Sequence, residues 1–251
     1  MRLVPRRRRC GAALRLARAT APLFRLSELY RRQERSRVSG ALDIATHMVL
    51  HTLTKNGVLF DPIFEFDGYD DFLRTYQEGR GILLVAAHNA LSLLILRRFY
   101  DAGIPSITIS SDALPVLGTR NEAPIIDASS PFLVAARSRL RQGEIVGAMI
   151  DRSEHHRDKD AERTFEFETA NGPVIVAPAL LHVAARCGSK VVFVEAHAET
   201  GGLAGTLVVA ASADADGLTR EYIDFVRAHL SSRLAGTGLA HVEDAVGAPA
   251  S

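Results

Sequence analysis

His88 and Asp151 are the residues whose types and positions best fit proton-transfer chemistry. Each directly follows a short apolar run that is typical of a buried strand, residues 82–87 before His88 and residues 144–150 before Asp151. An imidazole, with an ordinary pKa of about 6.5, can take the proton of a hydroxyl group at neutral pH. A carboxylate on its far ring nitrogen orients the ring and stabilises its charged form. The two residues therefore predict a general base, His88, and a candidate orienting group, Asp151.

The neighbours of these two residues are candidates for binding the substrate. Asn89 and Ser92 follow His88 closely, and Arg152 follows Asp151, where its guanidinium group could bind a phosphate of a substrate. Each assignment has a structural alternative: Asn89 or Ser92 capping a helix, and Arg152 on a solvated loop. His88 can equally be a hydrogen-bonded histidine at a strand end, and Asp151 a helix cap or loop anchor.

Other titratable residues are weaker candidates. Asp112 and Asp127 are second choices for the orienting carboxylate. His155 and His156 resemble metal ligands, but adjacent histidines in a charged loop are typical of a solvated segment, so the sequence predicts no metal site. His182 lies inside an apolar helix and is most simply a core or interface residue.

The elements around these residues predict an α/β fold with layers, in which a mostly parallel sheet is flanked by helices. Apolar strand-like runs alternate with amphipathic segments of helical period, a pattern typical of βαβ units. In such sheets, ligands bind outside the carboxyl ends of the strands, where His88 and Asp151 fall. Expected strands cover 64–66, 82–87, 104–110, 144–150, 165–168, 190–196 and 203–211, and expected helices cover 26–56, 70–78, 91–101, 131–142, 174–187 and 218–234.

The charge distribution divides the chain. Residues 1–40 contain twelve arginines and two glutamates, a formal charge of +10, whereas the rest carries −9. Apolar residues, among them Leu14, Leu16 and Ala17, are interleaved with the arginines, a pattern typical of an interfacial helix on an anionic membrane. A solvated, frayed terminus is the alternative. Phe24 and Tyr30 are the only stacking platforms in this segment, so no nucleic-acid partner is expected.

Composition limits the class of protein. With 251 residues, 47% of them hydrophobic, the chain can bury a full core, so wholesale disorder is excluded. We expect a basic N-terminal arm over 1–25, one α/β domain over 26–235 and a frayed tail over 236–251. Two cysteines, Cys10 and Cys187, cannot form a disulfide framework, which favours a reducing compartment. No apolar run is long enough for a membrane-spanning helix.

Three stretches resemble the lipid A biosynthesis acyltransferases, the lauroyl/myristoyl branch of the lysophospholipid-acyltransferase-like superfamily. Residues 65–88 are similar to the family's helix, Gly-rich turn, strand and catalytic histidine. Residues 140–152 resemble its strand ending in Asp-Gln, here Asp151-Arg152. Residues 165–194 resemble its Phe-Phe-Gly segment and the helix and strand that follow. Together the stretches cover about half of the chain.

The resemblance implies a glycerolipid-acyltransferase-like fold and a function. It implies a peripheral acyltransferase at the cytoplasmic face of the inner membrane, which moves a fatty acyl chain to a hydroxyl of a glycolipid or lysolipid. The acyl carrier protein or coenzyme A thioester would be a co-substrate, with no other cofactor. The chain departs from the family where Leu93 replaces the acidic residue five positions after the histidine, and it has no tryptophan. A decayed, non-catalytic lipid-binding or partner protein of the same fold is therefore the alternative.

Overall fold

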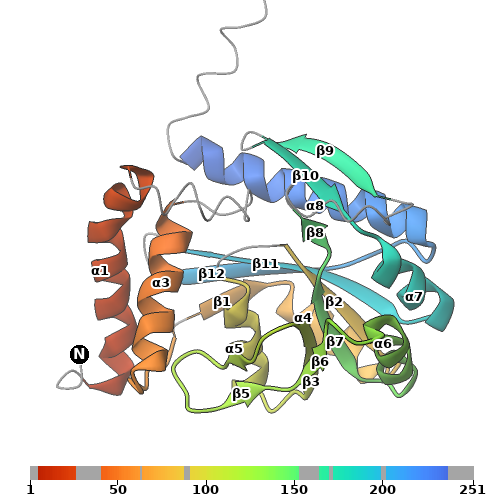
Figure 1. The fold of residues 1–251 in the computed structure, drawn as a ribbon, viewed down its shortest axis with the longest axis horizontal. Coiled ribbons are helices and arrows are strands. Elements are labelled where there is room, and N and C mark those ends of the chain that lie inside the picture. Colours follow the sequence, from red (N-terminus) through yellow and green to blue (C-terminus); the bar gives the residue numbers. More distant parts are fainter. Residues whose placement is uncertain are drawn as a thin grey trace, which may run out of the picture.

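The computed structural model describes residues 5–26, 41–62, 64–87, 91–152, 164–169, 172–198 and 202–236. At its centre lies a seven-stranded sheet in the order β1-β12-β11-β2-β7-β3-β6 (Figure 1). Neighbouring strands are parallel except for β11 and β12, which are antiparallel. The predicted α/β class with a mostly parallel sheet is therefore confirmed. The strands are β1 (Phe64–Asp67), β2 (Ile82–Ala86), β3 (Ser106–Ser110), β6 (Ile125–Asp127), β7 (Ile145–Met149), β11 (Lys190–Ala198) and β12 (Leu203–Val209).

Helices cover both faces of the sheet because its central strands are apolar on both sides. Alternate residues of a strand point to opposite faces, so Leu83 and Val85 join one core and Ile82 and Leu84 another. The first core packs against α6 (Phe132–Arg141), α7 (Ala179–Cys187) and α8 (Ala215–Gly236). The second core packs against α4 (Tyr69–Gln77) and α5 (Leu93–Asp101).

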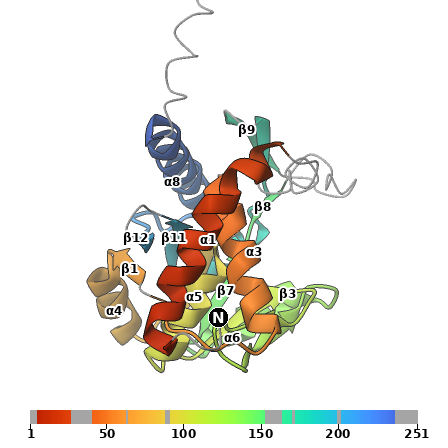
Figure 2. The same cartoon turned by 90° about the vertical axis from the view of Figure 1, so that its left-hand side faces the viewer.

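Two further helices stand side by side at the end of the sheet where β11 ends (Figures 1 and 2). They are α1 (Arg6–Leu26) and α3 (Ala41–Lys55), and the predicted helix over 26–56 agrees with α3 over its described part. Small residues on one side of α1 are buried: Cys10, Ala13 and Ala17 are each at most 1% exposed, and Cys10 and Ala13 share a core cluster with Leu50 of α3. These two helices form a third core with the end of β11, the start of β12 and the start of α5.

The N-terminal segment predicted as a basic arm is thus a helix that packs against the body of the protein. Leu14 and Ala17, counted among the membrane-facing residues of the sequence pattern, are buried against protein, whereas Leu16 is 52% exposed. The Arg9 guanidinium group donates to the Leu59 carbonyl oxygen at 2.8 Å. Within the described residues, no helix is both long and apolar enough to cross a membrane.

The prediction of a helix over 174–187 is wrong in its first third. Residues Gly172–Val176 form β10, which lies between β8 (Asp151–Arg152) and β9 (Phe165–Thr169) in a small antiparallel sheet. The run Val174-Ile175-Val176 is β-branched throughout and pairs with both neighbours, which favours a strand. Helix α7 begins only after Pro178, at its N-cap position. A two-stranded pair, β4 (Leu114–Pro115) and β5 (Glu122–Ala123), was also not predicted.

Candidate active site at the carboxyl edge of the sheet

The carboxyl end of β2 lies in the middle of the sheet, between β7, which ends level with it, and β11, which extends beyond it. Its last residue, Ala86, is opposite Met149 of β7 and Val194 of β11. His88 and Asn89 come next in the sequence and lie outside the described residues, as do His155 and His156. The site is therefore built here from the side chains that β7, β11 and α5 bring to this edge.

Asp151 is a buried carboxylate on the β7 side of this edge. It belongs to β8, where its backbone lies opposite Val176, and its side chain is 2% exposed. The Tyr222 hydroxyl, from α8, donates to Asp151 Oδ1 at 3.0 Å. Burial, followed by the Asp151 charge and this hydrogen bond, raises the pKa of Tyr222 well above its usual value. Tyr222 therefore remains a hydrogen-bond donor to Asp151 at any physiological pH.

Two of the predicted binding residues lie at the same edge. The Ser92 hydroxyl is buried and donates to the Ala87 carbonyl oxygen at 2.9 Å, so it ties the start of α5 to the end of β2. Ser92 occupies the N-cap position of α5, but its side chain makes no capping hydrogen bond. The backbone of Arg152 lies opposite Ile175 in β8.

The second-choice carboxylates are farther from β2. Asp127 ends β6, and β7 and β3 lie between β6 and β2, a separation of about 14 Å at ordinary strand spacing. Its side chain accepts hydrogen bonds from the Ser129 backbone N–H and hydroxyl, which lower the pKa of Asp127. Asp112 is exposed in the loop after β3, and its backbone carbonyl and N–H contact the Ser110 hydroxyl. The sheet order thus leaves Asp151 as the predicted carboxylate nearest the end of β2.

A largely apolar cavity of about 380 Å³ opens at the carboxyl ends of β2, β3 and β7. Ala86, Ile95, Ala148, Ile150 and Leu180 contribute apolar surface to it. The polar groups at its wall are few: the hydroxyls of Ser92, Thr108, Ser110 and Ser111. Thr108 Oγ1 is buried and has no hydrogen-bond partner among the described residues. An apolar pocket with a few polar groups at a sheet's carboxyl edge is typical of a small-molecule binding site.

The structure also brings a second carboxylate to this edge, which the sequence-based prediction missed. Glu195 of β11 is 2% exposed, and its Oε1 lies 2.9 Å from His197 Nδ1. The signal in the sequence was Glu-Ala-His at the end of an otherwise apolar strand, because residues two apart in a strand share a face. Just beyond, Asp43 of α3, also buried, accepts a hydrogen bond from the Ala198 backbone N–H at 2.9 Å.

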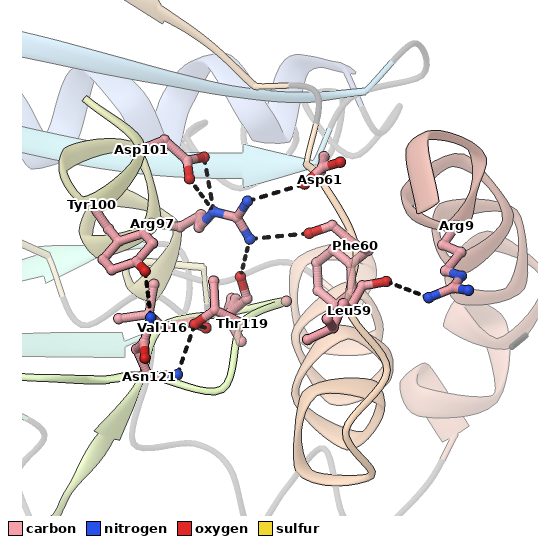
Figure 3. A network of polar contacts seen from close by, with 12 residues as sticks. Arg9, Leu59, Phe60, Asp61, Arg97, Tyr100, Asp101, Val116, Thr119 and Asn121 are labelled. Carbon is pink, nitrogen blue, oxygen red and sulfur yellow. Dashed lines mark hydrogen bonds and ion pairs between the residues drawn. The ribbon is translucent and has the colours of Figure 1, made fainter. Parts of the chain in front are cut away.

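A polar network around Arg97 fixes α5 beside the cavity (Figure 3). Arg97 is 3% exposed, and its guanidinium group donates to the Phe60 and Leu117 carbonyl oxygens and to both Asp101 carboxylate oxygens. A longer contact of 3.3 Å reaches Asp61. This one side chain therefore joins α5 to two loops that are distant in the sequence.

Comparisons with known proteins add no assignment. No protein-family model matches the chain, and a search of curated proteins found no match. Among the described residues, no group of three or more His, Cys, Asp or Glu side chains is placed to bind one metal ion.

Proposed function

We propose that this protein is an acyltransferase of the glycerolipid-acyltransferase-like fold. It transfers a fatty acyl chain from a thioester, carried by an acyl carrier protein or coenzyme A, to a hydroxyl group of a glycolipid or lysolipid. The observation that supports this best is the apolar cavity at the carboxyl edge of the sheet, beside the strand that His88 follows. The cavity offers apolar surface to the acyl chain, and its open edge is where the thioester carbonyl would lie.

The residues at this edge have separate tasks in the proposed reaction. His88 takes the proton of the acceptor hydroxyl, whose oxygen attacks the thioester carbonyl carbon. The carbon–sulfur bond then breaks, and a proton reaches the departing sulfur. Asp151 is the proposed orienting group, held by Tyr222, and Arg152 contacts a phosphate of the donor or acceptor.

The proposal includes a membrane surface on which the lipid acceptor is met. The exposed side of α1 carries Arg8, Arg15 and Leu16. Cations beside an exposed apolar residue suit an anionic lipid surface. In the proposed arrangement the protein is peripheral, on the cytoplasmic face of the inner membrane.

The test is an acyl-transfer assay with the full chain, radiolabelled acyl-coenzyme A or acyl carrier protein, and lysolipid and glycolipid acceptors. We expect transfer by the native protein and a loss of at least about 100-fold in His88→Ala, the usual contribution of a general base. Equal transfer by both proteins would contradict the base assignment. If the native protein binds lipid but transfers nothing, the decayed-enzyme alternative, motivated by Leu93, replaces the proposal.

A second variant tests the cavity itself. Gly147 of β7 lines it, and a Cβ added there would approach Thr108 Oγ1 to 3.3 Å. Gly147→Val therefore narrows the cavity, and we expect transfer of palmitoyl chains to fall more than transfer of octanoyl chains. Ala185→Val, on a part of α7 that does not line the cavity, is the control. An unchanged chain-length preference in Gly147→Val would show that the acyl chain binds elsewhere.

A further inference from the structure

Thr108 carries the one hydroxyl group at the cavity wall that makes no hydrogen bond within the part of the chain that the structure describes. The other three hydroxyl groups each contact a protein oxygen atom, and they belong to Ser92, Ser110 and Ser111. Leaving a buried hydroxyl group without a partner is costly, and such a group in a native protein calls for an explanation. The place of Thr108 Oγ1 in a cavity wall points to a partner on the molecule that the cavity binds.

A notch lies beside this hydroxyl group because the residue next to it across the sheet is a glycine. Leu84 of β2, Gly147 of β7 and Thr108 of β3 lie opposite one another on three adjacent strands, and all three line the cavity. A Cβ added to Gly147 would approach Thr108 Oγ1 to 3.3 Å, so the space that the glycine leaves adjoins the hydroxyl group. An atom of a bound molecule in this notch can therefore reach Thr108 Oγ1.

The side chains around the notch favour a mostly apolar molecule over a trapped water molecule. A buried water typically makes about three hydrogen bonds to polar groups. Thr108 supplies one hydroxyl group, whereas the neighbouring side chains of the cavity, Leu84 and Ile95 among them, are apolar. A chain that is apolar over most of its length and carries one oxygen atom at the notch satisfies both kinds of neighbour.

The notch lies well away from the end of β2, where the thioester carbonyl is proposed to lie. Thr108 is two strands from β2, and Leu84, which is level with it, comes two residues before Ala86. At ordinary strand spacing and rise, Thr108 is about 12 Å from the end of β2. An oxygen atom that reaches Thr108 therefore belongs to the middle of a long acyl chain and not to the carbons next to its carbonyl group.

We propose that the acyl chain bound in this cavity carries a hydroxyl group near its middle, which forms a hydrogen bond with Thr108. The inference rests on the proposed acyl transfer and names its substrate class, long acyl chains hydroxylated in mid-chain. A threonine hydroxyl group both donates and accepts, so it pairs with a chain hydroxyl in either sense. Thr108 determines specificity and takes no part in the bonds that form or break.

The experiment measures binding of three fatty acids to the full chain by isothermal titration calorimetry: palmitate, 3-hydroxypalmitate and 10-hydroxypalmitate. We expect the native protein to bind 10-hydroxypalmitate about five-fold more tightly than the other two, the value of one typical net hydrogen bond. Thr108→Val replaces the hydroxyl group by a methyl group. This variant should bind 10-hydroxypalmitate more weakly than palmitate, because the chain hydroxyl then loses water without gaining a partner.

The ratio of two dissociation constants within one variant does not depend on how much protein is folded, so a loss of stability cannot imitate the result. Thr206→Val is the matched control, because Thr206 is a half-buried threonine of β12 that does not line the cavity, and it should keep the native ratio. An unchanged preference in Thr108→Val would overturn the role of Thr108. Equal binding of all three acids by the native protein, or a preference for 3-hydroxypalmitate, would overturn the mid-chain hydroxyl group.

This binding experiment and the acyl-transfer assay fail separately. If the native protein prefers 10-hydroxypalmitate through Thr108 but transfers no acyl chain, the selective binding site stands and the proposed transfer is overturned. If the native protein binds none of the three acids, the inference is overturned, and the transfer assay decides the proposed function on its own.

Discussion

Arg97 shows how much one buried cation depends on acceptors from distant parts of the chain. Its guanidinium group is the hydrogen-bond donor to two loop carbonyls, those of Phe60 and Leu117, and to Asp101 (Figure 3). Arg97→Met keeps the apolar stem but leaves these carbonyls without their donor. We expect the free energy of unfolding to fall by about 3 kcal/mol, since each buried unpaired group costs about 1–3 kcal/mol.

Urea denaturation of the two proteins measures this difference. Arg141→Met is the control, because Arg141 is exposed at the end of α6, and it should change the free energy of unfolding by less than about 0.5 kcal/mol. Equal stability of Arg97→Met and the native protein would mean that water replaces the guanidinium group at both carbonyls.

Tyr222 gives the second prediction at the residue scale, a dependence of stability on pH. Its pKa is raised in the folded protein by burial, and then by the charge of Asp151 and their hydrogen bond. Above pH ~10 the unfolded chain loses the Tyr222 proton while the folded protein keeps it. The unfolded state then binds fewer protons, so stability falls as pH rises, by about 1.4 kcal/mol per pH unit for this group.

Tyr222→Phe removes this contribution. We expect the variant to be less stable near neutral pH, because buried Asp151 loses its hydroxyl donor. Between pH 10 and 11, about the titration range of an ordinary tyrosine, the variant should lose less stability than the native protein. Guanidinium denaturation at a series of pH values gives both comparisons. Parallel stability curves for the two proteins in this range would contradict the assignment of the titration to Tyr222.

Elements bounded by glycine and built from short apolar runs were predictable. Strands β2, β7 and β11 and helix α6 lie within about two residues of their expected positions, because local period and turn residues specify them. Pairing across the chain was not predictable. Nothing local in Val174–Val176 shows that β8 and β9 flank it, and Tyr222 is 71 residues from Asp151. The Glu195–His197 pair was visible as a spacing, but its burial depends on the elements that cover β11.

At the scale of elements, the prediction concerns how tightly α1 packs against α3. Ala17 is fully buried, one turn after Ala13, which packs in the same cluster as Leu50 of α3, whereas Ala19 is exposed. Ala17→Leu adds volume to a closely packed contact, which typically costs about 1–3 kcal/mol. We expect α1 to separate from α3 more often, so that trypsin cleaves after Arg15 faster than in the native protein. Ala19→Leu adds the same volume at an exposed position and should cleave at the native rate.

At the scale of the whole molecule, a basic N-terminal segment is joined to an acidic remainder, with charges of +10 over residues 1–40 and −9 over the rest. Docking of α1 on α3 places Arg8 and Arg15, two helical turns apart, on one exposed side. We expect the protein to bind vesicles containing phosphatidylglycerol and not vesicles of phosphatidylcholine alone. Binding should weaken as salt is raised, because the charges are screened.

The variant pair Arg8→Gln/Arg15→Gln tests whether this helix is the surface that binds. Each basic residue near an anionic bilayer contributes about 1 kcal/mol, so the loss of two predicts binding weaker by about 30-fold in vesicle sedimentation. Arg137→Gln/Arg141→Gln, on the exposed side of α6, changes the net charge equally and should bind like the native protein. If the two double variants weaken vesicle binding equally, net charge alone drives the binding, and α1 is not the surface that binds the membrane.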